Sequence, residues 1–337
     1  MKRLMGVVLI VAGIVGLVFL FNGGKLSLGS LGGISESFDM GKSVASDEAD
    51  RLHIEAGSAE VRLVPVSEER VSAELRGSQS GLAIGRKLPE LTVQSRSGTI
   101  EVNVGSSRGF GITFGRTTLT VEVPSRMWEE LRAEAGSGDL VATGLEANVL
   151  EIKTGSGDIE LTDISAEQGS VSAGSGDVSV EQMTARLLAV ETGSGKIELT
   201  RLYGGDAQVK TGSGGIEVDG YELLTLTVDA SSGNIELEDG LAELNGRAGS
   251  GNIDLATDEL RRDTMLETGS GNVEVELARE PASLEVRYDG GSGRGRIEWD
   301  GFAYDTDERD HDRIRGAFGS GDVLLDVRTG SGNFRLD

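Results

Sequence analysis

Cysteine is absent from this 337-residue chain, and proline, histidine and aromatic residues are scarce, with 4 Pro, 2 His and 4% Phe, Trp and Tyr. Without cysteine there is no disulfide framework, no thiolate metal site and no cysteine nucleophile. The two histidines, His53 and His311, lie far apart in sequence, and neither has a recognisable nucleophile arrangement beside it. We therefore predict no catalytic residue and no cofactor.

Basic residues are also in the minority: 32 Lys and Arg face 56 Asp and Glu, which gives a net charge of −24. Such a chain repels nucleic-acid phosphates, and it has no Lys/Arg cluster that could bind them, so nucleic acid is excluded as a partner. The charge still permits attraction to cationic partners, or bridging to other polyanions through divalent cations.

One long hydrophobic run exists, from Leu4 to Phe21. As a helix it reaches about 27 Å, close to the hydrocarbon thickness of a bilayer. Lys2 and Arg3 precede it and only Lys25 follows closely, which predicts a cytoplasmic N-terminus with the bulk of the chain extracytoplasmic. No Ala-x-Ala site follows, which favours a retained transmembrane helix over the alternative, a cleaved signal peptide.

Glycine, by contrast, is abundant, with 51 residues, and much of it recurs in a fixed pattern. A Gly-Ser-Gly turn repeats every 19 residues, beginning at Gly136, Gly155, Gly174, Gly193 and Gly212. The pattern continues, with one residue lost and one gained, at 231–233, 249–251 and 269–271, and weaker copies occur before and after this array. A repeat of this kind is the signature of a stacked repeat architecture.

Apolar residues alternate with polar ones on both sides of each turn, which predicts strands. After the turn the apolar pairs include Ile159 and Leu161, and Ile216 and Val218; before it, Val209 and its equivalents form one column. Columns of one chemical character predict an all-β fold, a β-solenoid resembling a parallel β-helix with rungs of about 19 residues, stacked about 4.8 Å apart. We expect the turn glycines to supply positive φ and to let adjacent rungs approach closely.

Two outward columns carry charge. The first is an acidic stripe formed by Glu160, Ser179, Glu198, Glu217, Glu236, Asp254 and Glu274. The second alternates in sign from Glu191 onward, through Lys210, Asp229, Arg247 and Glu267, which indicates cross-rung charge pairing. We predict no built metal site, but weak and diffuse binding of divalent cations at Glu198, Glu217, Glu236, Asp254 and Glu274.

A calcium-binding β-roll is the alternative reading of the Gly-Ser-Gly-Asp turns. The column after the turn reads Asp139, Asp158, Asp177, Lys196, Gly215, Asn234, Asn252 and Asn272, which is no regular ladder of anionic ligands. The acidic segment from Asp305 to Asp312 does not match an EF-hand, because its sixth position is Asp310 instead of Gly. We expect a solvated loop there, with an adventitious metal site as the alternative.

The Gly-Ser-Gly-Asp/Asn-Ile-Glu-Leu rungs, the irregular early strands at 52–63 and 71–75, and the ending from Ile314 to Leu336 resemble the bacterial putative-adhesin family of unknown function. With its short N-terminal anchor the chain is similar to the LiaG-like membrane proteins found with Gram-positive envelope-stress systems. The resemblance covers residues 50–337. It implies a β-solenoid at the envelope but no ligand or reaction, and no catalytic residue carries over.

The expected organisation is a transmembrane anchor (1–24), a flexible spacer (25–50), an irregular β entry and capping module (51–128) that includes Phe110, Phe114 and Trp128, regular solenoid repeats (129–280), and uneven C-terminal β rungs (281–337). The predicted function is a non-enzymatic, single-pass cell-membrane protein whose acidic solenoid serves adhesion, scaffolding or envelope-stress response. Its expected partners are the lipid bilayer, through Leu4 to Phe21, and divalent cations, envelope polymers or membrane proteins.

A carbohydrate-active β-helix enzyme acting on envelope or extracellular glycans is the alternative function. Such an enzyme needs a pair of carboxylates in a concave site. A flat ladder of side chains on the rung surfaces would favour the non-enzymatic function instead.

Overall fold

The computed structural model describes residues 36–84, 88–105, 110–305 and 312–337. All regular secondary structure in these ranges is β, in 24 strands. The predicted transmembrane helix from Leu4 to Phe21 lies outside the described residues. Within them, no helix has the length and hydropathy needed to cross a bilayer.

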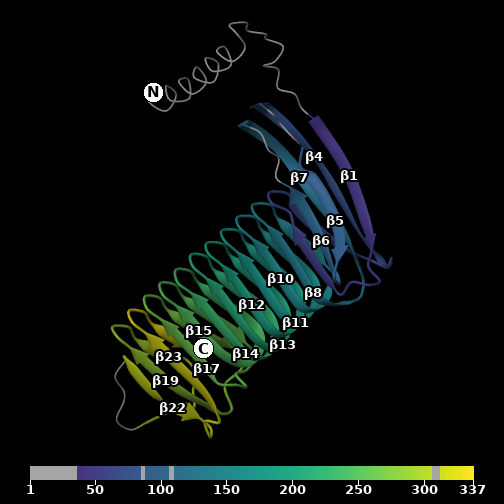
Figure 1. The fold of residues 1–337 in the computed structure, drawn as a ribbon. Helices are drawn as coiled ribbons and strands as arrows, with labels where there is room; N and C mark the ends of the chain where they lie inside the picture. The colour runs from purple at the N-terminus through teal and green to yellow at the C-terminus, as the bar shows by residue number, and fades with distance from the viewer. Residues whose placement is uncertain (1–35, 85–87, 106–109, 306–311) are drawn as a thin grey trace, which may run out of the picture.

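The centre of the molecule is a stack of parallel rungs, visible as the regular coil in Figure 1. Ile159 pairs with Val178, Val178 with Ile197, and Ile197 with Ile216, so each rung repeats the previous one in register. The long strands are β11 (Ile159–Ala173), β12 (Val178–Thr192), β13 (Ile197–Thr211), β14 (Ile216–Ala230) and β15 (Ile235–Ala248), preceded by β8 (Met127–Ala135), β9 (Leu140–Thr143) and β10 (Glu146–Thr154). The predicted all-β, solenoid-like repeat fold is confirmed for the described part of the chain.

The core runs along the inside of this stack as columns of identical or similar side chains. Val209 and Ile216 are 0% and 1% exposed, and the buried positions alternate with exposed ones along each strand, as the sequence pattern predicts. A buried Thr column adds polar links between rungs: the Thr192 hydroxyl donates to the Gly176 carbonyl (2.8 Å) and accepts from the Gly195 amide (3.2 Å). The core therefore has no unsatisfied hydroxyl at this position.

The turn glycines of the regular array are required for the close approach of neighbouring rungs. A Cβ added at the second glycine of the turns from Gly155 to Gly271 would lie about 2 Å from the carbonyl oxygen of the equivalent glycine in the previous rung, for example 1.8 Å for Gly176 and 1.9 Å for Gly195. No glycine of this regular array has a left-handed φ, so the expectation of positive φ is wrong there. It holds at weaker copies of the turn, where Gly57, Gly98, Gly319 and Gly321 have φ values of 58°, 79°, 57° and 69°.

In the regular array the left-handed conformation occurs at a corner, which lies inside a long strand in β11 to β15 and between β9 and β10 at Gly144. Equivalent residues 19 positions apart take φ values from 47° to 67°: Gly144, Asp163, Gln182, Arg201, Gly220 and Asp239. The inter-rung pairing skips this position, since Thr162 pairs with Glu181 and Ile164 with Met183. The corner thus bends each long strand, and most rungs build it without glycine.

At the N-terminal end, sequence order and spatial order differ. Strands β2 (Arg51–Glu55) and β3 (Glu60–Val66) lie between β6 (Thr99–Gly105) with β7 (Phe110–Pro124) on one side and β8 with β9 on the other. Antiparallel strands cover this end: β5 (Glu90–Arg96) pairs with β6, β4 (Arg70–Ile84) with β7, and β1 (Glu36–Ala45) with β4.

Strand β1 corrects the predicted spacer. Residues Glu36–Ala45 fall within the range 25–50, yet all ten pair with β4, so this part is not a flexible linker. Phe38 is only 9% exposed and lies against Gly77, where a Cβ would meet its ring at 2.5 Å. The Ser- and Gly-rich composition of the predicted spacer hid the apolar alternation of Phe38, Met40 and Val44, all packed on the core.

The C-terminal end shows the same inversion. Strands β23 (Val323–Thr329) and β24 (Phe334–Leu336) lie between an inner rung of β17 (Thr264–Thr268) and β18 (Val273–Leu277) and an outer rung of β19 (Leu284–Gly290) and β20 (Gly295–Ile297). β16 (Ile253–Thr257) connects this part to β15, and β22 (Arg313–Phe318) pairs antiparallel with β19 and with β21 (Ala303–Tyr304). The last rung of the chain, β23 and β24, therefore lies between two rungs that precede it in the sequence.

Candidate functional site

The acidic stripe predicted from the sequence forms a ladder of carboxylates on the solenoid surface. Glu198, Glu217, Glu236, Asp254 and Glu274 are register partners in five successive rungs. Ser179 precedes them and Arg335 follows, because Ser179 pairs with Glu198 and Glu274 with Arg335. Like charges in adjacent rungs repel, so the ladder needs positive charge nearby.

Two basic side chains of the protein supply part of that charge. The Lys196 ammonium lies 2.5 Å from Glu198 Oε1 and 2.7 Å from Glu217 Oε2, and these hydrogen-bonded ion pairs raise the pKa of Lys196. At the other end, Arg335 Nη1 lies 2.8 Å from Glu274 Oε1. The ladder is thus partly neutralised at both ends by the protein itself.

Glu236 and Asp254 form the middle of the ladder, and neither has an ion pair in the described part of the chain. Burial, with the nearby carboxylates of Glu274, Glu236 and Glu276, raises the pKa of Asp254. The folded chain therefore disfavours the ionised form of Asp254.

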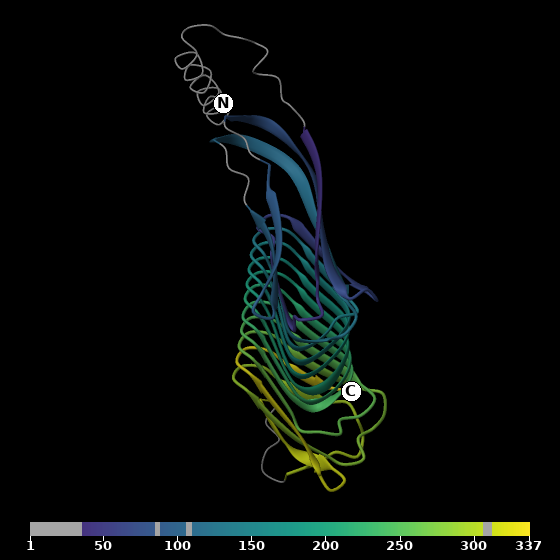
Figure 2. The ribbon, with the colours of Figure 1, turned by 45° about the vertical axis from the view of Figure 1, so that its right-hand side comes forward.

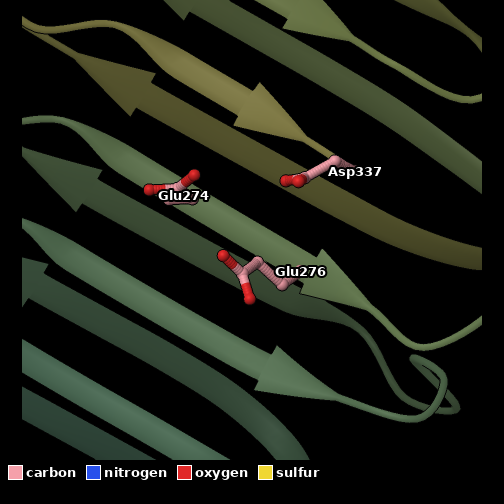
Figure 3. A group of neighbouring side chains, drawn as sticks. All are labelled: Glu274, Glu276 and Asp337. Carbon is pink, nitrogen blue, oxygen red and sulfur yellow. The ribbon is translucent and has the colours of Figure 1, made fainter.

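A tighter group of carboxylates lies beside the end of the ladder (Figure 3). Glu274, Glu276 and Asp337 each have a ligand atom within 4.8 Å of the others. Arg335 Nη2 is 2.9 Å from Asp337 Oδ2, so a guanidinium already provides positive charge to this group. Its oxygens could hold a cation only in competition with Arg335.

Sequence reasoning missed Glu276 and Asp337 because they come from strands far apart in the chain. β24 stacks on β18 with a separation of 61 residues, as in the Asn333–Asn272 contact. The sequence does show that a rung exists there, since Gly330-Ser331-Gly332-Asn333 repeats the turn at 269–272. The repeat does not show which rung β24 stacks on.

The Asp and Asn column after the turns is structural. Each side-chain oxygen accepts the backbone N–H of its equivalent in the next rung: Asp158 N to Asp139 Oδ1 (3.0 Å), Asp177 N to Asp158 Oδ1 (2.8 Å), and Asn272 N to Asn252 Oδ1 (2.9 Å). This bond needs one carbonyl-type oxygen and no charge, which explains why Asp and Asn interchange in this column. The carboxylates here are used to join rungs.

The column of alternating charge is also aligned across rungs. Glu191 pairs with Lys210, Lys210 with Asp229, and Asp229 with Arg247 in the backbone register. Arg247 Nε lies 3.7 Å from Glu267 Oε2. Lys210 and Asp229 are half-buried and the others are exposed, so solvent still screens each pair, which contributes at most about 1 kcal/mol.

The remaining candidates from the sequence do not form a site. His53 Nε2 lies 3.2 Å from Glu130 Oε1 on the strand surface, and its register neighbours are Glu101 and Arg132. The loop 306–311, which contains Asp310 and His311, lies outside the described residues, as do the side chains of Phe110 and Phe114. Trp128 is buried and carries Arg126 over its ring at 4.2 Å.

A shallow groove of about 690 Å³ runs across β10 to β14, lined among others by Val149, Gln168 and Leu187. Its two carboxylates are occupied: Glu151 pairs with Arg132, and Asp206 accepts from the Thr225 hydroxyl at 2.6 Å. They stand three rungs apart, about 14 Å at the usual strand spacing. The carboxyl pairs of glycosidases lie closer, at about 5–9.5 Å.

Stacked parallel rungs with antiparallel strands at both ends and in-register charged ladders define an all-β protein of the repeat type. The chain belongs to the Toastrack DUF4097 family, whose model matches residues 49–238 and, overlapping them, 183–337. This confirms the family resemblance drawn from the rung motif.

Several solved structures are similar to this chain. A putative cell adhesion protein from Clostridium sporogenes is 12% identical, with 89% of this chain and 99% of that chain covered and a TM-score of 0.22. A putative lipid binding protein from Parabacteroides distasonis is 14% identical, with 89% and 96% covered and a TM-score of 0.40. A putative adhesin from Bacteroides fragilis is 11% identical, with 89% and 97% covered and a TM-score of 0.35. Comparison with curated protein sequences gives no match.

Proposed function

We propose that this chain is a non-enzymatic protein of the bacterial cell envelope. Leu4 to Phe21 holds it in the cell membrane with the N-terminus in the cytoplasm, and the solenoid is presented on the extracytoplasmic side for adhesion, scaffolding or envelope-stress response. Its partners are divalent cations, envelope polymers or membrane proteins that meet the solenoid surface.

The observation that carries this proposal is the flat ladder from Glu198 to Glu274. Its carboxylates stand side by side in register and partly exposed, with Glu198 and Glu217 side chains 51% and 44% exposed. Such a surface attracts cations and polycations over a long distance, but it does not enclose a reacting group. The geometry therefore supports binding along a face.

The carbohydrate-active alternative would need two free carboxylates facing each other across a groove. In the described groove over β10 to β14, Glu151 and Asp206 are engaged by Arg132 and Thr225. Glycan turnover by the protein would favour the enzyme hypothesis.

Membrane topology is tested on the full chain in intact cells. We expect the protein to resist alkaline carbonate extraction, to retain Met1 or Lys2, and to lose its solenoid when protease is added to protoplasts. A mature N-terminus after residue 22, recovered from the medium, would contradict the anchor.

The ladder is tested with ions. We expect millimolar calcium or magnesium to raise the melting temperature modestly and with little selectivity, since the ions relieve repulsion without a built site. A double variant, Glu236→Gln with Asp254→Asn, should lose most of this effect, whereas Glu191→Gln, outside the ladder, should keep it. Stability independent of cations in the parent protein, or glycan turnover that disappears in the double variant, would overturn the proposal.

A further inference from the structure

A hollow of about 640 Å³ lies beside the left-handed corners of the stack, and we call it the corner groove; its lining includes Tyr203, Gly220, Tyr221, Glu222, Asp239 and Gly240. Its rungs are coloured green in Figure 2, close to the loops that project from the edge of the stack. In β13 the ladder residue Glu198 precedes the corner at Arg201, whereas Tyr203 follows it. The corner groove is therefore a surface separate from the acidic ladder.

Two glycines leave room for the corner groove. Gly220 stands in the corner column between Arg201 of the rung before and Asp239 of the rung after, and it adds no side chain there. Gly240 is the register partner of Tyr221, and a Cβ on it would lie 1.9 Å from Tyr221 Cζ, the ring carbon that bears the hydroxyl. The Tyr221 ring thus occupies the place of a side chain at position 240, and its hydroxyl end lies over the next rung.

The Tyr221 hydroxyl is a hydrogen-bonding group on a buried side chain. Tyr221 is 5% exposed and contributes to the lining of the corner groove, and none of the described residues hydrogen-bonds to its hydroxyl. Burial raises the pKa of Tyr221, so the hydroxyl keeps its proton at neutral pH and can donate a hydrogen bond. A ligand oxygen in the corner groove would satisfy this donor, and native structures rarely leave such a group unpaired.

An exposed aromatic ring and two carboxylates also line the corner groove. Tyr203 is 42% exposed, and its register partner in the next rung is Glu222. Neither the Glu222 nor the Asp239 carboxylate forms a hydrogen bond or ion pair with another described residue. The other groove carboxylates, Asp258 and Glu259, each lie 3.5 Å from an arginine nitrogen. The rungs of β13, β14 and β15 therefore bring together an apolar plane, free acceptors and a protonated donor.

We propose that the corner groove binds a sugar ring of an uncharged glycan. The Tyr203 ring packs against the apolar face of the sugar, in a site that combines an aromatic surface with a few placed polar groups. Sugar hydroxyls donate to the Glu222 and Asp239 carboxylates, and one sugar oxygen accepts from the Tyr221 hydroxyl. A cation could not accept that last hydrogen bond, and an anionic polymer would be repelled by the free carboxylates. This inference rests on the proposed binding of an envelope polymer, and it names the class of polymer and a place for it away from the ladder.

Isothermal titration calorimetry tests this on the full-length chain in phosphatidylcholine nanodiscs, with chitohexaose, cellohexaose and maltohexaose as neutral probes and oligogalacturonate as an anionic one. We expect saturable binding of at least one neutral probe and none of oligogalacturonate. Tyr203→Ala should weaken binding about tenfold, because the apolar contact is lost. Tyr221→Phe keeps the ring and removes the hydroxyl, and should weaken binding about fivefold. The matched control is Tyr304→Ala, which removes a tyrosine of the same 42% exposure outside the groove and should leave the affinity unchanged.

Binding of none of the neutral probes, or equal weakening by Tyr203→Ala and Tyr304→Ala, would overturn the proposal. Binding of trilysine instead of the glycans, lost in Glu222→Gln, would refute it and assign the groove to a cationic partner, and release of reducing ends from a probe would assign it to an enzyme. If circular dichroism shows that Tyr203→Ala fails to fold, Asp239→Asn gives the same comparison, with Asp163→Asn at an equivalent exposed corner outside the groove as its control. Membrane topology and the ion effect on the ladder are measured without glycan, so failure of the probes to bind refutes the corner groove alone.

Discussion

Adding one methyl group to a turn should separate two rungs of the solenoid. At Gly195 a Cβ would lie 1.9 Å from the Gly176 carbonyl oxygen and 2.5 Å from its carbonyl carbon, where ordinary van der Waals contact begins at 3.4 Å. Both partners are backbone atoms, and neither can rotate away. Gly195→Ala therefore forces the two turns apart by about 1 Å or more.

The loss in free energy of unfolding can be worked out from the hydrogen bonds that join the two turns. Separation stretches the bonds from the Thr192 hydroxyl to the Gly176 carbonyl (2.8 Å) and from the Lys196 amide to Asp177 Oδ1 (2.7 Å). Each bond contributes about 0.5–1.5 kcal/mol, and the stranded Thr192 hydroxyl is buried. With about 1–3 kcal/mol for overpacking, we expect the substitution to lower the free energy of unfolding by about 3–5 kcal/mol.

Thermal unfolding followed by circular dichroism measures this loss, and we expect the melting temperature to fall by roughly 5–10 °C. The control is Gly220→Ala at the left-handed corner, where φ is 67° and the nearest atom to a Cβ is 3.8 Å away. A methyl group fits at Gly220, so this substitution costs only the strain of a left-handed alanine, about 1 kcal/mol. If Gly195→Ala cost no more than Gly220→Ala, close stacking would not be the reason for glycine in the turns.

Three further predictions concern the core, the ladder and the order of the rungs. Val209→Asp places an unpaired charge in the core and should cost several kcal/mol, whereas Glu217→Ala should do little; equal falls in melting temperature would contradict the inward and outward assignment. Because the pKa of Asp254 is raised above its usual 3.8, its ionisation destabilises the fold above that raised pKa, and the penalty disappears as the pH falls through the usual value. Asp254→Asn should therefore raise the melting temperature at pH 7, with a gain that shrinks toward about pH 4; a gain that is constant with pH would refute the cause. Phe334→Ala should cost about 3–5 kcal/mol and should speed hydrogen exchange at 284–297 as well as at 323–336, because its rung lies between the others; exchange changes confined to 323–336 would contradict this order.

The repeat itself was predictable, because residues that stack in a solenoid recur in the sequence at the repeat period. With a period of 19 residues, Val190, Val209 and Val228 must meet one another if the rungs stack, and the structure pairs them in this way. The acidic ladder follows from the same argument, since Glu198 and Glu217 occupy equivalent positions. The alternation along each strand and the repeat period are enough to predict which columns face the core and which face the solvent.

The order of the rungs at the two ends could not be predicted from the period. The turn at 330–332 identifies a rung, but any rung can in principle stack on any other with a similar turn. Here Asn333 donates its backbone N–H to Asn272, 61 residues earlier, and accepts from Arg294 at its side chain. The turn motif does not contain this order, since residues 278–329 separate the two rungs in the chain.

The left-handed corners were hidden for a different reason. Asp163, Gln182 and Arg201 share φ values near 58° but no side-chain chemistry, and only Gly144 and Gly220 in this column give the usual signal of positive φ. We expected positive φ at the glycines of the turns instead, but in the regular array these glycines allow close approach of the rungs. In a repeat protein, glycine content therefore indicates close approach between rungs as readily as backbone conformation.

Antiparallel strands at both ends limit where a partner can bind. An open rung would offer unpaired N–H and C=O groups to a strand of another chain. β4 and β5 cover β7 and β6 at one end, and β22 covers β19 at the other, so growth of the stack by further parallel rungs is blocked at these strands. The side-chain ladders stay at least partly exposed along the described stack. Because a ladder presents the same group about every 4.8 Å, it matches an extended polymer or a row of cations better than a compact ligand. This spacing supports the proposal that envelope polymers or divalent cations meet the ladder.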